Sequence, residues 1–223
     1  MRLITVRSPI SLIPRSVPHQ VDIIEYVNTD RSNQYTLHTG SRGVCRTDSG
    51  GDFDGNPLGT ECRSGAGSNN GCGIEDVDGT AGAPFNAGCG GVVVMLWDET
   101  QLSFWRFARD EIPQDIRNSH PNPDSWGTPT ARWTNESCDI KNSFRDMQST
   151  SHRLRFLEYD VEKNTFFLFP VVINITICGD WAGSAYDNGN FPGTCAEAVA
   201  DPSNYDGMTL SPLLAITTCS NFL

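Results

Sequence analysis

The chain has 223 residues, a mass of 24.4 kDa, a formal net charge of −11 and an isoelectric point near 4.6. Nucleic acids and anionic membranes would repel so acidic a protein, which excludes both as expected partners, whereas a neutral polysaccharide carries no such penalty. Twenty-one glycines and thirteen prolines favour short strands joined by loops, and the length suffices for one all-β domain with a sizeable core.

The cysteines indicate an oxidising compartment. Their even number, in a loop-rich acidic chain, predicts disulfides and an extracellular protein. No two of them have the spacing of a zinc site or a redox centre, so we expect no metal and no cofactor. The eight stand at positions 45, 62, 72, 89, 138, 178, 195 and 219.

The first eighteen residues make a poor signal peptide. They carry three arginines, but Ser8, Pro9 and Pro14 interrupt the apolar run. The longest apolar run, residues 166–178, contains Pro170 and is too short to span a bilayer. Because the cysteines and the leader disagree, we rely on the cysteines and keep the expectation of secretion without a membrane span.

The first predicted strand runs from Val21 to Val27 and is rich in β-branched and apolar residues. In a regular strand Gln20, Asp22 and Ile24 share one face and Glu25 lies on the other. One bulge residue after Asp22 would bring Glu25 onto the face of Gln20 and Asp22. Two carboxyl groups about 5–5.5 Å apart are what a retaining glycosidase needs. The alternative is an amphipathic strand whose acidic residues lie in solvent.

A second strand is predicted over residues 34–39, after a polar turn at 29–33. So short a connection makes a hairpin, in which the second strand lies beside the first. Tyr35 and Leu37 then share one face, while Thr36 and His38 share the other. His38 is therefore a candidate for the carboxylate groove, with a structural or solvent-facing histidine as the alternative.

Residues 40–91 lack helical or strand periodicity and are predicted to be a loop pinned by disulfides. The acidic stretch at 48–56 is not an EF-hand, because Pro57 occupies the glycine position when the count starts at Asp52.

Two further strands are predicted at 91–97 and 101–108, around a tight connection. Trp105 lies on the second, where it packs in the core or stacks on a sugar ring. Four prolines make 112–129 a predicted loop. Short strands follow at 131–133 and 171–178, and a capping box at Thr194 opens a predicted helix through Val199.

Several motifs, in a fixed order, resemble the fungal laminarinase-like branch of glycoside hydrolase family 16, the endo-β-1,3(4)-glucanases. They cover most of 21–148 and 177–205. In order they are Val21-Asp-Ile-Ile-Glu25 followed by Asn28, Tyr35-Thr-Leu-His-Thr39, Pro84-Phe-Asn-Ala87, Gly90-Gly-Val-Val-Val-Met-Leu-Trp97, Ile112-Pro-Gln-Asp-Ile116, Pro121-Asn-Pro-Asp-Ser-Trp-Gly-Thr-Pro129, Cys138-Asp-Ile140, Cys178-Gly-Asp-Trp-Ala-Gly183 and Thr194-Cys-Ala-Glu-Ala-Val199.

The resemblance implies a β-jelly-roll sandwich of the concanavalin A type, incomplete at the N-terminus, acting as a monomer on β-glucans with retention of configuration. It places Glu25 at the acid/base position and Asp22 at the carboxylate that helps hold Glu25 protonated. His38 and Trp181 fall on positions that line the cleft, and Trp105 is a further candidate for sugar binding.

Gln20 falls on the nucleophile position. An amide can neither form the glycosyl-ester intermediate nor stabilise the oxocarbenium-like transition state as a carboxylate does. We therefore expect greatly reduced hydrolysis in this chain. The alternative is a non-catalytic β-glucan-binding module.

Three segments have no counterpart in the family pattern. The expected organisation is an unmatched segment at 1–18, a family 16 domain at 19–206 with an unmatched insertion at 149–169, and an unmatched tail at 207–223. This distribution leads to a further alternative, a misjoined or truncated gene product that exposes sheet edges and does not fold stably.

Overall fold

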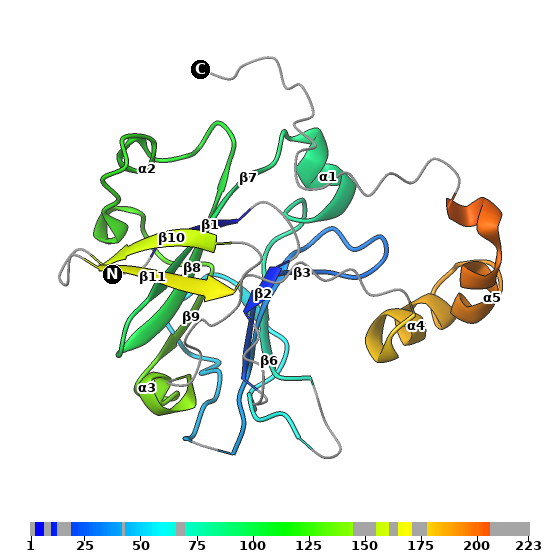
Figure 1. Cartoon of the computed structure of the whole chain (residues 1–223), viewed down its shortest axis with the longest axis horizontal. Coiled ribbons are helices and arrows are strands. Elements are labelled where there is room, and N and C mark those ends of the chain that lie inside the picture. The colour runs from blue at the N-terminus through cyan, green and yellow to red at the C-terminus, as the bar shows by residue number, and fades with distance from the viewer. Residues whose placement is uncertain are drawn as a thin grey trace.

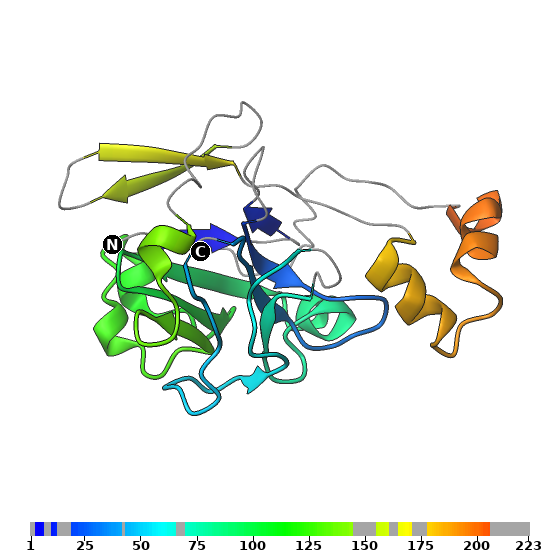
Figure 2. The same cartoon turned by 90° about the horizontal axis from the view of Figure 1, so that it is seen from below.

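The computed structural model describes residues 3–6, 10–12, 19–41, 43–65, 70–144, 155–160, 165–170 and 178–205. Its main elements are two antiparallel sheets, which Figures 1 and 2 show from two directions. The five-stranded sheet contains, in spatial order, β2 (Ile10–Leu12), β3 (Gln20–Glu25), β4 (Gln34–His38), β6 (Cys72–Glu75) and β5 (Asn56–Pro57). The four-stranded sheet contains β1 (Leu3–Val6), β7 (Gly91–Trp97), β8 (Gln101–Ala108) and β9 (Ala131–Thr134).

A separate hairpin and several short helices complete the described fold. No helix in the described ranges is long and apolar enough to cross a membrane. Both views show α4 and α5 to one side of the sheets (Figures 1 and 2). The hairpin is β10 (Arg155–Asp160) with β11 (Thr165–Pro170), and the helices are α1 (Gly82–Ala87), α2 (Gln114–Arg117), η1 (Pro123–Ser125), α3 (Ile140–Ser143), α4 (Asp180–Asp187), α5 (Cys195–Ala200) and η2 (Pro202–Tyr205).

The core lies between the two larger sheets. Val21 and Ile23 from β3 and Tyr35 and Leu37 from β4 are fully buried in it. Tyr35 stacks on Phe104 of β8, with ring centroids 4.7 Å apart. Because alternate residues of a strand point to opposite faces, the inward apolar residues leave Asp22, Thr36 and His38 on the other face of the sheet.

Most of the predicted strands are confirmed within one or two residues, as β3, β4, β7, β8 and β9. The predicted loop at 40–91 is wrong in part, because it contains β5, β6 and α1, and the predicted loop at 112–129 contains α2 and η1. The segment before residue 19 supplies β1 and β2, which pair with β7 and β3. The predicted strand at 171–178 lies outside the described residues except for its last position.

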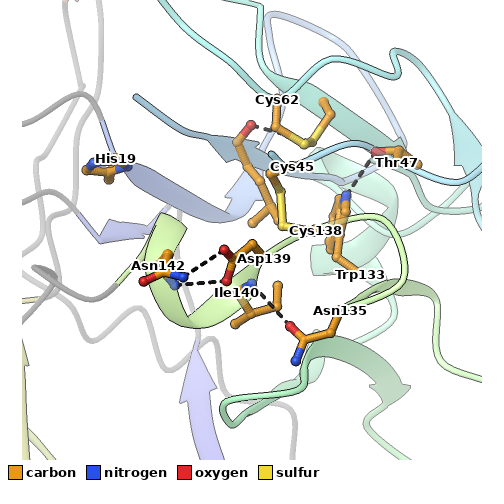
Figure 3. Close-up of a disulfide and its surroundings, with 12 residues drawn as sticks. His19, Cys45, Thr47, Cys62, Trp133, Asn135, Cys138, Asp139, Ile140 and Asn142 are labelled. Carbon is orange, nitrogen blue, oxygen red and sulfur yellow. Dashed lines mark hydrogen bonds between the residues drawn. A yellow bond between two sulfur atoms is a disulfide. The ribbon is translucent and has the colours of Figure 1, made fainter. Parts of the chain in front are cut away.

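Three disulfides join described cysteines, which confirms the prediction of disulfides. They link Cys45 to Cys138, Cys62 to Cys72 and Cys178 to Cys195. Figure 3 shows the Cys45–Cys138 bond beside Trp133, whose indole Nε1 donates a 2.9 Å hydrogen bond to Thr47 Oγ1. This disulfide therefore ties the long loop after β4 to the segment after β9.

Candidate functional site

The bulge expected in the first strand is present in β3. Asp22 is opposite Thr36 of β4, yet Glu25 is opposite Gln34, so three steps along β3 match two steps along β4. The pairing with β2 shifts at the same place. Ile23 and Ile24 are the two residues between these pairs, and they occupy the space of one residue on β4. Ile23 is buried in the core and Ile24 packs against it. Glu25 therefore comes onto the face of Asp22 instead of pointing inward.

Glu25 is half-buried and accepts two short hydrogen bonds. Gln34 Nε2 and Thr36 Oγ1 each donate to Glu25 Oε2 over 2.7 Å. Burial raises the pKa of Glu25 above its ordinary value, and the negative charge of Asp22 raises it further. The two hydrogen bonds and nearby His38 act in the opposite direction without reversing the shift. A carboxyl with a raised pKa is suited to donate a proton near neutral pH.

Asp22 is almost completely buried and lies between an amide and an imidazole. Gln20 Nε2 donates a hydrogen bond to Asp22 Oδ1. His38 Nε2 lies 3.2 Å from Asp22 Oδ2, although without the angles of a hydrogen bond. On its other side, His38 Nδ1 contacts Ser64 Oγ at 2.8 Å. The structure thus brings Gln20, Asp22, Glu25 and His38 together, as the sequence predicted.

Asn33 is a part of the site that the sequence analysis missed. Its side-chain Oδ1 accepts a hydrogen bond from the Glu25 backbone N–H over 2.9 Å, and its Nδ2 donates to the Ile23 carbonyl over 3.1 Å. An asparagine between a polar turn and a strand is common in turns of any function. Only the register of the bulge shows that this one contacts the candidate site.

The structure does not place Trp105 or Trp181 with the carboxylates. Trp105 lies on β8 in the other sheet, is 7% exposed, and donates from Nε1 to the Gly127 carbonyl. It lines a separate cavity of about 200 Å³ together with Trp126 and Arg106. Trp181 lies on α4, to one side of the sheets, and is 45% exposed.

The fold and the site together define the class of protein. On one face of an antiparallel sheet, a bulged strand presents a carboxyl with a raised pKa, a second carboxylate and an amide. A pair of carboxyl groups on one face is typical of glycoside hydrolases. Within the described ranges, no group of three or more His, Cys, Asp or Glu side chains is arranged to hold a metal ion.

The sequence comparisons identify the family. The profile of the XgeA-like catalytic domain of glycoside hydrolase family 16 matches residues 16–151, and the chain belongs to this family. It is 34% identical over 185 residues to a probable endo-1,3(4)-β-glucanase of Aspergillus flavus, covering 83% of this chain and 23% of that protein. It is 30% identical over 204 residues to the endo-1,3(4)-β-glucanase xgeA of Emericella nidulans, covering 92% of this chain and 26% of that protein.

The structural comparison agrees with the family. A structure of the family 16 laminarinase 16A from Phanerochaete chrysosporium, with two β-glucans in its donor and acceptor sites, matches with a TM-score of 0.68. It is 29% identical, and the match covers 91% of this chain and 66% of that one. Such neighbours imply a jelly-roll sandwich. The chain spans about a quarter of the length of the two glucanases above.

Proposed function

We propose that the chain carries the site of a retaining endo-β-1,3(4)-glucanase on β3 and that its hydrolysis is limited by Gln20. The observation that supports this most is the bulge, which puts Asp22 and Glu25 on one face. Burial and the charge of Asp22 raise the pKa of Glu25, in keeping with a general acid. Glu25 would protonate the leaving oxygen and then activate the water that completes the reaction.

Gln20 limits the reaction because retention requires a carboxylate nucleophile. The amide is uncharged, and its Nε2 is already bonded to Asp22. It can form no glycosyl ester and gives little stabilisation to a positively charged transition state. Substrate binding does not depend on these steps, so a chain with Gln20 can hold a glucan that it barely cleaves.

The same contact favours a second candidate function, a non-catalytic module that binds β-glucan. In this proposal the hydrogen bond from Gln20 to Asp22 replaces the repulsion that two carboxylates would have there. His38 would contact sugar beside the carboxylates, while Trp181 and Trp105 would contact it elsewhere. The disulfides between described cysteines support an extracellular location, where such polysaccharides are found.

Replacing Gln20 by glutamate separates the two functions. We expect Gln20→Glu to raise the release of reducing sugar from laminarin or lichenan by roughly 10³-fold or more, because it restores the nucleophile. Adding Glu25→Gln should abolish the gain. Gln114→Glu makes the same chemical change on exposed α2 and should leave activity unchanged.

A pull-down on insoluble glucan completes the experiment. Retention of both the natural chain and Gln20→Glu, without sugar release from either, would favour the binding module. Release by Gln20→Glu would support the glucanase site. Neither retention nor release, from a chain that melts cooperatively, would overturn both proposals.

A further inference from the structure

The bulge in β3 leaves backbone groups that the sheet does not pair. A bulge residue interrupts the ladder, and buried backbone N–H and C=O groups are costly when they have no partner. At this bulge the side chain of Asn33 bonds to both sides, accepting from the Glu25 N–H and donating to the Ile23 carbonyl. One carboxamide thus spans the bulge, from the carbonyl of Ile23 to the N–H of Glu25.

We propose that Asn33 is a positioning residue that fixes the bulge and thereby sets how deeply Glu25 lies beside Asp22. Its importance for catalysis rests on the function proposed above. Its effect on Glu25 itself does not, because that effect is a property of the folded chain alone.

Asn33 is itself firmly held. Its side chain and backbone are 2% exposed. Its backbone N–H donates to Thr80 Oγ1 over 2.8 Å, and its carbonyl accepts from the Asp76 N–H over 2.8 Å. Thr80 Oγ1 in turn donates to the Val77 carbonyl. The carboxamide is therefore anchored by a segment that follows β6, far away in the sequence.

The apolar residues of β3 and the side chain of Asn33 determine different properties of Glu25. In a regular strand Glu25 would share the inward face with Val21 and Ile23, and burying a carboxylate there is expensive. The pattern therefore selects the side on which Glu25 lies. The apolar pattern does not fix how far Glu25 lies from Asp22 or how deeply Glu25 is buried. If the bulge loosens, water can reach its backbone and Glu25 can become more exposed while it stays on the same face. A side chain can hydrogen-bond to both the Glu25 N–H and the Ile23 carbonyl only if it carries an acceptor and a donor close together, as a carboxamide does.

The charged groups that act on Glu25 are Asp22 on the same strand and His38 on β4. Gln34 and Thr36 contact it as neutral donors. Replacing Asn33 leaves the chemical identity of all four of these groups unchanged. A change in the ionisation of Glu25 would then report its position.

The test is an NMR titration of the Glu25 carboxyl in the full chain, with hydrogen exchange of the Glu25 amide. In Asn33→Ala we expect the pKa of Glu25 to fall toward the ordinary value, since exposure to water removes the main cause of its rise. The Glu25 amide should exchange at least about tenfold faster, because it loses its acceptor. In the Gln20→Glu background, the alkaline limb of the activity profile should move to lower pH, with kcat affected more than KM.

Asn135→Ala is the matched control. Asn135 also bridges two backbone groups, because it donates to the Glu99 carbonyl and accepts from the Ile140 N–H, and Figure 3 shows the second of these bonds. It follows β9 of the other sheet, whereas Asp22 and Glu25 lie on β3. Asn135→Ala should lower stability without changing the pKa of Glu25. Thr80→Val removes an anchor of Asn33 with little change of volume, and it should reproduce the effect of Asn33→Ala in a weaker form.

An unchanged Glu25 pKa and unchanged amide exchange in Asn33→Ala would overturn the proposal, even if the variant is less stable. If Asn33→Ala fails to fold, the Glu25 pKa and the exchange of the Glu25 amide are measured in Thr80→Val instead, and unchanged values there would overturn the proposal. If the pKa falls in these variants but Gln20→Glu releases no sugar, the positioning role stands and the glucanase function fails.

Discussion

At the scale of single residues, Glu25 shows how a site suited to acid catalysis reduces the stability of the fold. Burial is the main cause of its raised pKa, and the charge of Asp22 is the second. Both keep the carboxyl protonated over a wider pH range, which a general acid requires. Both also make the ionised form costly in the folded protein, because they penalise the same negative charge.

Glu25→Gln tests this cost through the pH dependence of stability. The folded pKa lies above the ordinary value of 4.5, so the folded state binds the proton more tightly than the unfolded state. This stabilisation is fully present below about pH 4.5 and is lost as pH rises through the folded pKa. Glutamine is neutral throughout and keeps an oxygen for Gln34 and Thr36. We therefore expect the variant to unfold at higher urea concentration than the natural chain at pH 7.

The comparison needs the whole pH series. The two proteins should converge below about pH 4.5, where Glu25 is protonated in both states. Equal urea midpoints at every pH from 4 to 8 would show that Glu25 ionises in the fold without cost, and the acid/base assignment would lose its physical basis.

At the scale of elements, the sequence predicted those strands and helices whose formation depends on neighbouring residues in the chain. β-branched residues and alternation gave β3, β4 and β7, and the capping box gave α5. The sequence left the bulge as one of two alternatives, because a residue inserted after Asp22 would bring Glu25 onto the face of Gln20 and Asp22, and the register of β3 against β4 decides for it. In contrast, β6 is only Cys-Gly-Ile-Glu and exists because it pairs with β4 along its length. Likewise, Asn33 could not be recognised, because its partners depend on the register of two strands.

The helix α5 offers a test at this scale. Thr194 accepts a hydrogen bond from the Glu197 N–H, and the Glu197 carboxylate accepts one from the Thr194 N–H. Thr194→Ala removes the cap and should cost about 1 kcal/mol of local stability. Since both views place α5 to one side of the sheets, faster amide exchange should be confined to α5 and its neighbourhood (Figures 1 and 2). Thr194→Ser, which keeps the hydroxyl, should behave like the natural chain.

At the scale of the whole molecule, the disulfides connect segments that the sheets alone leave separate. Cys45–Cys138 spans a sequence separation of 93 residues and joins the loop after β4 to the start of α3, whereas Cys62–Cys72 spans only 10. All four cysteines are buried, so replacing either pair by alanine disturbs packing to a similar degree. The difference between the pairs then lies mainly in the unfolded chain.

The longer loop should therefore matter more. The chain-entropy relation gives about 4–5 kcal/mol for the Cys45–Cys138 link and about 3 kcal/mol for Cys62–Cys72. We expect Cys45→Ala with Cys138→Ala to lower the free energy of unfolding by about 2 kcal/mol more than Cys62→Ala with Cys72→Ala, measured by urea denaturation under oxidising conditions. Equal losses would mean that the unfolded chain stays compact near these cysteines. A larger loss for the short link would show that Cys62–Cys72 acts through the folded state, where Cys72 lies in β6 beside β4 and the candidate site.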